Sequence, residues 1–100
     1  MAKSTIEIKR DPRIIHLNAT GDLNVQQAKH LKARFQEILA EPLETHIALD
    51  RVASLDTTSV QLIFLFKQEM KKRSFPVNVS PPGDANVLNL LEKTGITKLL

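Results

Sequence analysis

Short strand-like segments alternate along this chain with longer helix-like segments, and their order restricts the folds that the chain can adopt. Residues 5–9 alternate apolar and polar side chains, which predicts a half-buried strand. Asp11 and Pro12 mark a turn, so residues 14–19 are expected to return as the second strand of a hairpin. The Thr-Gly-Asp segment at residues 20–22 breaks this strand pattern.

Two amphipathic segments predict helices. The first begins after Asn24, which can cap it with Gln27 three residues later as in a capping box, and Pro42 ends it. Its expected packing face consists of Val25, Ala28, Leu31, Phe35 and Ile38. The second follows Asp56, and its first half is so apolar that we expect it to be mostly enclosed. Its apolar residues are Val60, Leu62, Ile63, Phe64, Leu65, Phe66 and Met70.

The remaining segments complete an alternating pattern. Residues 46–49 predict an interior strand buried on both faces, and residues 75–79 predict another strand. Asp84 can cap a third helix that ends at Gly95. That helix and the apolar segment after it contain Val87, Leu88, Leu91, Ile96, Leu99 and Leu100. We therefore predict one α/β domain over residues 1–100, with a single-layer mixed sheet of four to five strands that combines parallel pairs with an antiparallel hairpin.

Composition excludes several classes of protein. An apolar fraction of 42% and a charged fraction of 25% are typical of a globular domain. The chain has no cysteine, so disulfide and thiolate chemistry are excluded. No apolar run is long enough to span a bilayer, and the first residues do not resemble a signal peptide. We expect a cytoplasmic protein that does not insert into membranes.

The net charge of +3 does not by itself indicate nucleic-acid binding. The basic residues gather where the second helix should end, and cations there complement the negative end of the helix dipole. They are Lys67, Lys71, Lys72 and Arg73. The chain has no Tyr or Trp on which bases would stack. We therefore expect no direct contact with nucleic acid.

No pattern in the sequence favours catalysis. The histidines stand on three different predicted elements without the spacing of metal ligands, at His16, His30 and His46. Asp50 is expected to face solvent at a strand end, so Asp50 and Asp56 do not make a convincing acid–base pair. The glycines stand alone in separate turns, and no nucleophile-elbow motif occurs. We expect no enzymatic activity, no metal and no cofactor.

The most informative segment is residues 54–60, where an acid and three consecutive hydroxyls precede the apolar helix. Asp56, Thr57, Thr58 and Ser59 would lie at the positive end of the helix dipole. A phosphate added there would contribute a charge of about −1.5 to −2 at a fixed point of the surface. One interpretation is a phosphorylation switch. The other is that Asp56 caps the helix and the hydroxyls are ordinary first-turn residues.

Three segments resemble the STAS domain family, which is found in bacterial anti-sigma factor antagonists. Residues 49–60 are similar to its signature, in which a strand leads to Asp-Ser-Ser-Gly-Leu and the second hydroxyl is phosphorylated. By position that residue is Thr58, with Thr57 before it. Residues 20–24 resemble the Gly-x-Leu-Asp segment before the first helix, and residues 87–96 resemble a leucine-rich helix ending in Thr-Gly-Ile. The similarity covers nearly the whole chain.

The resemblance implies a non-catalytic signalling module. Its partner would be an anti-sigma factor, a serine/threonine kinase of the histidine-kinase-like ATPase type, and phosphorylation at Thr58 or Thr57 would release it. A phosphatase would oppose the kinase. The implied partner-binding residues are Asp22, Asn24, Asp56, Thr57, Thr58 and Ser59.

Departures from the family pattern leave a second function open. Ser59 stands where the family usually has Gly, and Ala48 stands where Asp or Asn is frequent. An Asp followed by Thr also resembles STAS accessory subunits of lipid-transport ABC systems and STAS proteins linked to chemotaxis. In the transporter type the important hydroxyl follows the Asp directly, which would be Thr57. Such a protein would bind an ABC transporter ATPase constitutively.

Overall fold

The computed structural model describes residues 4–80. In chain order the elements are β1 (Thr5–Arg10), β2 (Ile14–Leu23), α1 (Val25–Ala40), β3 (Glu44–Leu55), α2 (Thr57–Lys72) and β4 (Val77–Ser80). The α/β fold predicted from the alternating pattern is confirmed, with four strands in the described part of the chain. The predicted third helix with Val87, Leu88 and Leu91, and the apolar residues Ile96, Leu99 and Leu100, lie outside the described residues.

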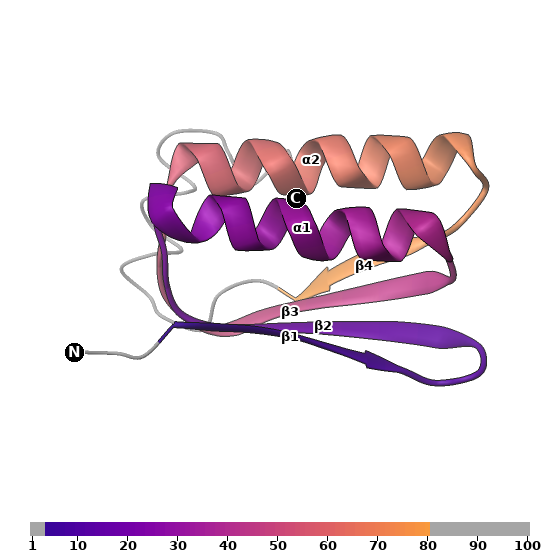
Figure 1. The fold of residues 1–100 in the computed structure, drawn as a ribbon, viewed down its shortest axis with the longest axis horizontal. Helices are drawn as coiled ribbons and strands as arrows, with labels where there is room; N and C mark the ends of the chain where they lie inside the picture. Colours follow the sequence, from indigo (N-terminus) through magenta and orange to yellow (C-terminus); the bar gives the residue numbers. More distant parts are fainter. Residues whose placement is uncertain (1–3, 81–100) are drawn as a thin grey trace.

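The strands form one mixed sheet in the order β1-β2-β3-β4. β1 and β2 pair antiparallel as the predicted hairpin, whereas β2–β3 and β3–β4 are parallel, as the helical crossovers require. Both described helices cover the same face of this sheet (Figure 1). Each helix follows a strand that ends at the same side of the sheet, so the N-termini of α1 and α2 lie at one end of the molecule (Figure 1).

The core lies between this face of the sheet and the two helices. Alternate residues of β2 and β3 point into it, and every third or fourth residue of each helix meets them. Phe35 and Phe66 stack with ring centroids 4.2 Å apart and join the two helices. The most deeply buried large side chains include Ile15, Leu17, Leu23, Leu31, Ile38, Ile47, Leu49, Ile63 and Met70.

Two strands are longer than their apolar patterns predicted. β2 does not end at Ala19 but continues through Gly21 to Leu23. Register shifts before and after Gly21, which has a φ of 78°, let the irregular segment stay paired with β3. β3 runs from Glu44 to Leu55 rather than over residues 46–49. Its residues alternate between the core and the uncovered face in this region, so the prediction of a strand buried on both faces was wrong.

Two apolar side chains lie outside the core that the sequence assigned to them. Val25, in the first turn of α1, is 65% exposed, although the pattern placed it on the packing face. Leu65 is 58% exposed because 100° per residue turns it away from the buried stripe that contains Ile63 and Phe66. The first half of α2 is therefore only partly enclosed.

In the described part of the chain, no helix combines the length and the apolar character that a membrane crossing requires.

Candidate functional site

Asp56 caps α2, as one of the two interpretations of this segment predicted. Its backbone is extended, with φ −91° and ψ 169°, and its Oδ1 accepts a hydrogen bond of 2.8 Å from the Ser59 backbone N–H. The Asp56 carbonyl accepts from the Val60 N–H at 3.1 Å and begins the helical ladder. The carboxylate is half-buried and engaged. The cap therefore fixes where Thr57 and Thr58 stand.

Ser59 anchors the start of α2 to the end of β2. Its side chain is fully buried, and its Oγ donates to the Leu23 carbonyl at 3.1 Å. The Asp56 N–H donates to the same carbonyl at 3.1 Å. A carbonyl with two lone pairs can accept both bonds. The Ser59 side chain thus holds the site from inside and is not available to a partner, contrary to its place among the predicted surface contacts.

Asp22 and Asn24 lie beside this junction because β2 and β3 end in register. Asp22 pairs with Ser54 across the two strands, and the Ser54 hydroxyl donates to Asp22 Oδ1 at 2.8 Å. Asn24 caps α1, with its Oδ1 accepting from the Gln27 N–H at 3.2 Å. One half of the predicted capping box is therefore present. The reciprocal bond from the Gln27 side chain does not form within residues 4–80.

The structure brings the predicted site residues together at the end of the molecule where both helices begin. Asn24, Thr57 and Thr58 are exposed, whereas Asp22 and Asp56 are half-buried. The result is a small polar surface with two carboxylates and two exposed hydroxyls, which we call the threonine face. It consists of Asp22, Asn24, Asp56, Thr57 and Thr58. Its backbone is fixed by the two helix caps and by the bonds to Leu23.

Both hydroxyls of the threonine face lie at the surface of the described structure. Within the described residues neither Thr57 nor Thr58 has a side-chain hydrogen-bond partner, so no base activates either hydroxyl. An enzyme that acts on this protein can reach both hydroxyls, because both side chains are exposed. Within residues 4–80, both hydroxyls are therefore open to contact by another molecule.

Two of the three histidines meet although they are far apart in sequence. His16 and His46 are register partners on the face of the sheet that the described helices leave uncovered, with ring centroids 6.1 Å apart. His46 Nε2 lies 2.7 Å from the Ser80 hydroxyl, and His16 Nε2 lies 3.6 Å from a carboxylate oxygen of Asp11. Over residues 4–80 no three potential ligands gather into a group that could hold a metal ion.

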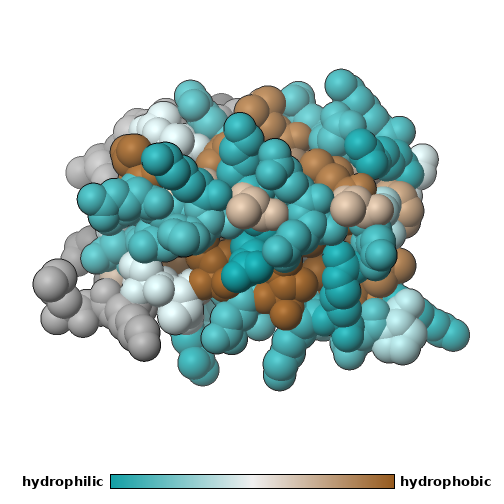
Figure 2. Space-filling model, in the orientation of Figure 1, coloured by the Kyte–Doolittle hydropathy of each residue, from teal (hydrophilic) through white to brown (hydrophobic). Residues whose placement is uncertain are grey.

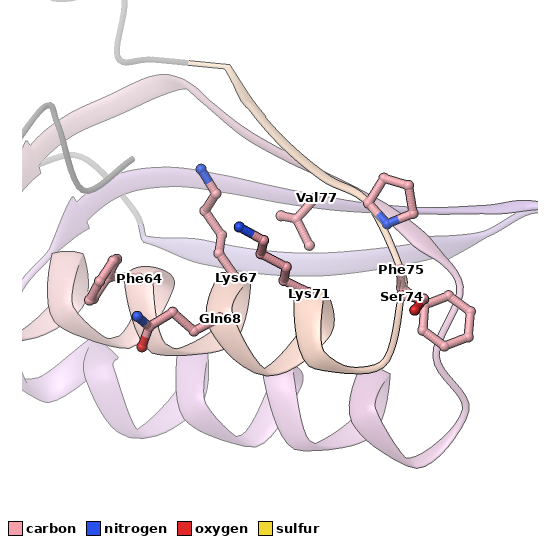
Figure 3. A pocket seen from close by; sticks show the side chains of 8 residues that line it. Phe64, Lys67, Gln68, Lys71, Ser74, Phe75 and Val77 are labelled. Atoms are coloured by element: carbon pink, nitrogen blue, oxygen red, sulfur yellow. The ribbon is translucent and has the colours of Figure 1, made fainter.

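A groove at the other end of α2 was not anticipated from the sequence. It has a volume of about 540 Å³ and runs between the second half of α2 and the start of β4. Figure 3 shows Lys67 and Lys71 extending over the same side of the helix, beside Val77. The sequence pattern that could have indicated this groove is Phe64 followed by Lys67 and Lys71 at helical spacing. These lysines were interpreted from the sequence only as complements of the helix dipole. The groove is separate from the threonine face.

Comparison with known families agrees with this geometry. A family model described as "Mlab, STAS domain" matches residues 6–100. The chain belongs to the STAS domain family. The resemblance of the sequence to this family is thereby confirmed. No curated protein sequence matches the chain.

Several solved structures share the fold at low sequence identity. A protein of Thermotoga maritima described as an anti-sigma factor antagonist is 20% identical, with a TM-score of 0.77 over 95% of this chain and 82% of that chain. The anti-sigma factor antagonist SpoIIAA in its unphosphorylated form is 11% identical, with a TM-score of 0.71 over 95% of this chain and 97% of the SpoIIAA chain. Mglu is 17% identical, with a TM-score of 0.68 over 76% of this chain. The present chain spans only 19% of the length of Mglu. The fold is therefore that of the anti-sigma factor antagonists.

Proposed function

We propose that this STAS domain is a non-catalytic cytoplasmic signalling module that binds a partner protein through the threonine face and is released when that face is phosphorylated. The proposed partner is an anti-sigma factor of the serine/threonine kinase type, with a histidine-kinase-like ATPase fold, and a phosphatase reverses the modification. The observation that carries the proposal is the exposure of Thr57 and Thr58 at a rigidly capped helix start, with both hydroxyls unbonded in the described residues.

The local structure favours Thr57 and Thr58 over the neighbouring hydroxyls as phosphate acceptors. Ser59 is sealed in the core and Ser54 is bonded to Asp22, whereas the two threonines are exposed. The helix dipole at the start of α2 partly compensates a phosphate at Thr58, and the caps leave the fold around it unchanged. The modification is therefore tolerated by the free protein, and its cost falls on the complex.

Electrostatics explain why a phosphate would release the partner. The threonine face already carries the carboxylates of Asp22 and Asp56. A partner that binds the unmodified protein therefore needs positive or hydrogen-bond-donating groups opposite these two carboxylates and none opposite Thr58. An additional charge of about −2 without a counter-charge in the interface costs several kcal/mol. A cost of about 3 kcal/mol lowers the affinity roughly a hundredfold, which dissociates a micromolar complex at cellular concentrations.

The proposal is tested by affinity capture from the native organism with three baits: the unmodified protein, Thr58→Ala and Thr58→Glu. We expect unmodified protein and Thr58→Ala to recover the same kinase-type partner and Thr58→Glu to lose it. Thr58→Ala should also resist phosphorylation by the recovered partner. Equal recovery of that partner by all three baits would contradict the switch.

Two observations favour a second candidate function. The matching family model is described as "Mlab, STAS domain" and not as an anti-sigma factor antagonist, and Thr57, which directly follows Asp56, is exposed, as Thr58 is. In this case the domain is a constitutive subunit bound to an ABC transporter ATPase, and the Thr57 hydroxyl hydrogen-bonds across a permanent interface. Thr57→Ala would then weaken the complex, and native protein would carry no phosphate by mass spectrometry.

A further inference from the structure

Among the described residues, nothing pairs with the outer edge of β1. Within the described residues β1 pairs only with β2, and no other described strand or helix lies along its free side (Figure 1). A hollow of about 650 Å³ follows this edge, lined by residues of β1 and by Arg34 and Glu37 of α1. Figure 2 shows apolar surface between α1 and this lower edge of the molecule. An open strand edge is a template for another strand.

The hairpin fixes which backbone groups face the open edge. The Asp11 N–H donates to the Ile14 carbonyl at 2.9 Å, so these residues belong to a hydrogen-bonded pair. In an antiparallel ladder such pairs alternate with non-bonded ones, and Ile8 opposite Leu17 falls on a non-bonded position. The N–H and C=O groups of Ile6, Ile8 and Arg10 therefore point away from β2, toward the open edge.

We propose that a second copy of this chain binds here, β1 against β1, antiparallel about a two-fold axis at Ile8. In this register Ile8 lies opposite Ile8 of the second copy, and Glu7 lies opposite its Lys9. Glu7 and Lys9 are exposed on the same face of the strand, and neither has an ion pair or side-chain hydrogen bond within residues 4–80. The strand is thus complementary in charge to itself, as a two-fold interface requires.

Charge selects this register from the alternatives. The outward groups of Ile6, Ile8 and Arg10 can also pair if one strand shifts by two residues in either direction. One shift places Glu7 opposite Glu7, and the other places Lys9 opposite Lys9, both of which are repulsive. Only the register centred on Ile8 pairs opposite charges and uses all three outward residues. A foreign apolar strand would leave Lys9 unpaired, so the same charges discriminate against it.

The surroundings of the edge fit a two-fold contact. Ile8 is only partly buried, so the Ile8 side chain of the second copy, beside it across the strand pair, would cover part of its exposed apolar surface. The Arg10 guanidinium donates to the Glu37 and Glu41 carbonyls at 3.1 and 2.9 Å, which links the end of β1 to the end of α1. The contact is small, so we expect a weak dimer that forms at high protein concentration. It leaves the threonine face uncovered and does not depend on the proposed function.

Sedimentation equilibrium with reversed charges tests this proposal. Unmodified protein should dimerise at low ionic strength, and Glu7→Lys or Lys9→Glu alone should raise the dimer dissociation constant at least roughly tenfold. An equimolar mixture of Glu7→Lys with Lys9→Glu should form a heterodimer, because each lysine then meets a glutamate. The double variant, which carries both changes, should dimerise like the unmodified protein.

Lys72→Glu is the matched control, because it makes the same charge change as Lys9→Glu at the far end of α2 and should leave dimerisation unchanged. The proposal is overturned if the unmodified protein stays monomeric to millimolar concentration at low salt. It is equally overturned if the single variants dimerise as well as the unmodified protein, or if the mixture of single variants gives no heterodimer. Circular dichroism of each variant checks that the fold is retained.

Discussion

Replacing Ser59 with alanine removes the buried bond that ties the start of α2 to the end of β2. The Ser59 hydroxyl donates to the Leu23 carbonyl at 3.1 Å and is fully buried. The carbonyl keeps its second bond from the Asp56 N–H, so no buried group is left without a partner. The cost is then the net value of one hydrogen bond, about 1 kcal/mol, rather than a full desolvation penalty. For a domain of this size the melting temperature should fall by about 4–8 °C.

Thr57→Ala is the matched control, since it removes a neighbouring hydroxyl that is exposed and unbonded in the described residues. Its effect on the free energy of unfolding should stay within about 0.5 kcal/mol. The assay is urea unfolding of both variants, monitored by far-ultraviolet circular dichroism and checked by calorimetry. If Ser59→Ala is as stable as Thr57→Ala, the bond to Leu23 does not anchor the helix, and the reasoning about a rigid site fails.

Further stability measurements address the cap, the core and the exposed leucine. Asp56→Ala should cost about 1 kcal/mol, whereas Asp56→Asn should keep the cap and cost a few tenths; equal losses in urea unfolding would contradict the cap. Phe66→Ala breaks the stack on Phe35 and should cost about 3–5 kcal/mol, a large part of the total stability, so a melting temperature within a few degrees of the original would refute it. Leu65→Ser should change the free energy of unfolding by less than about 0.5 kcal/mol, because Leu65 is exposed. Ile63→Ala should lower it by about 2–5 kcal/mol, because Ile63 is buried. Similar losses for the two variants in urea unfolding would show that Leu65 is covered.

The order of elements and the positions of both helix caps could be predicted because they depend on local chemistry. Asn24 and Asp56 are residues whose side chains satisfy free N–H groups, and each is followed by a helical apolar pattern. The hairpin turn at Asp11 and Pro12 follows from the same kind of signal. The switch interpretation requires Thr57 and Thr58 to lie at the surface, and both are exposed in the structure.

What could not be predicted depends on pairing between distant segments. The extension of β2 through Gly21 requires β3 beside it, since residues 20–22 form a turn by local preference alone. The burial of Ser59 depends on the Leu23 carbonyl, 36 residues earlier in the chain, so the sequence could not separate it from its exposed neighbours. The meeting of His16 with His46 likewise follows from the register of two strands.

The most direct test of the central proposal is to compare the affinity of the captured native partner for unmodified protein with its affinity for protein phosphorylated at Thr58. Isothermal titration calorimetry of both forms, with the site of modification verified by mass spectrometry, gives this ratio. An interface that tolerates no added negative charge predicts a loss of affinity of roughly a hundredfold on phosphorylation. Equal affinities for the two forms would contradict it.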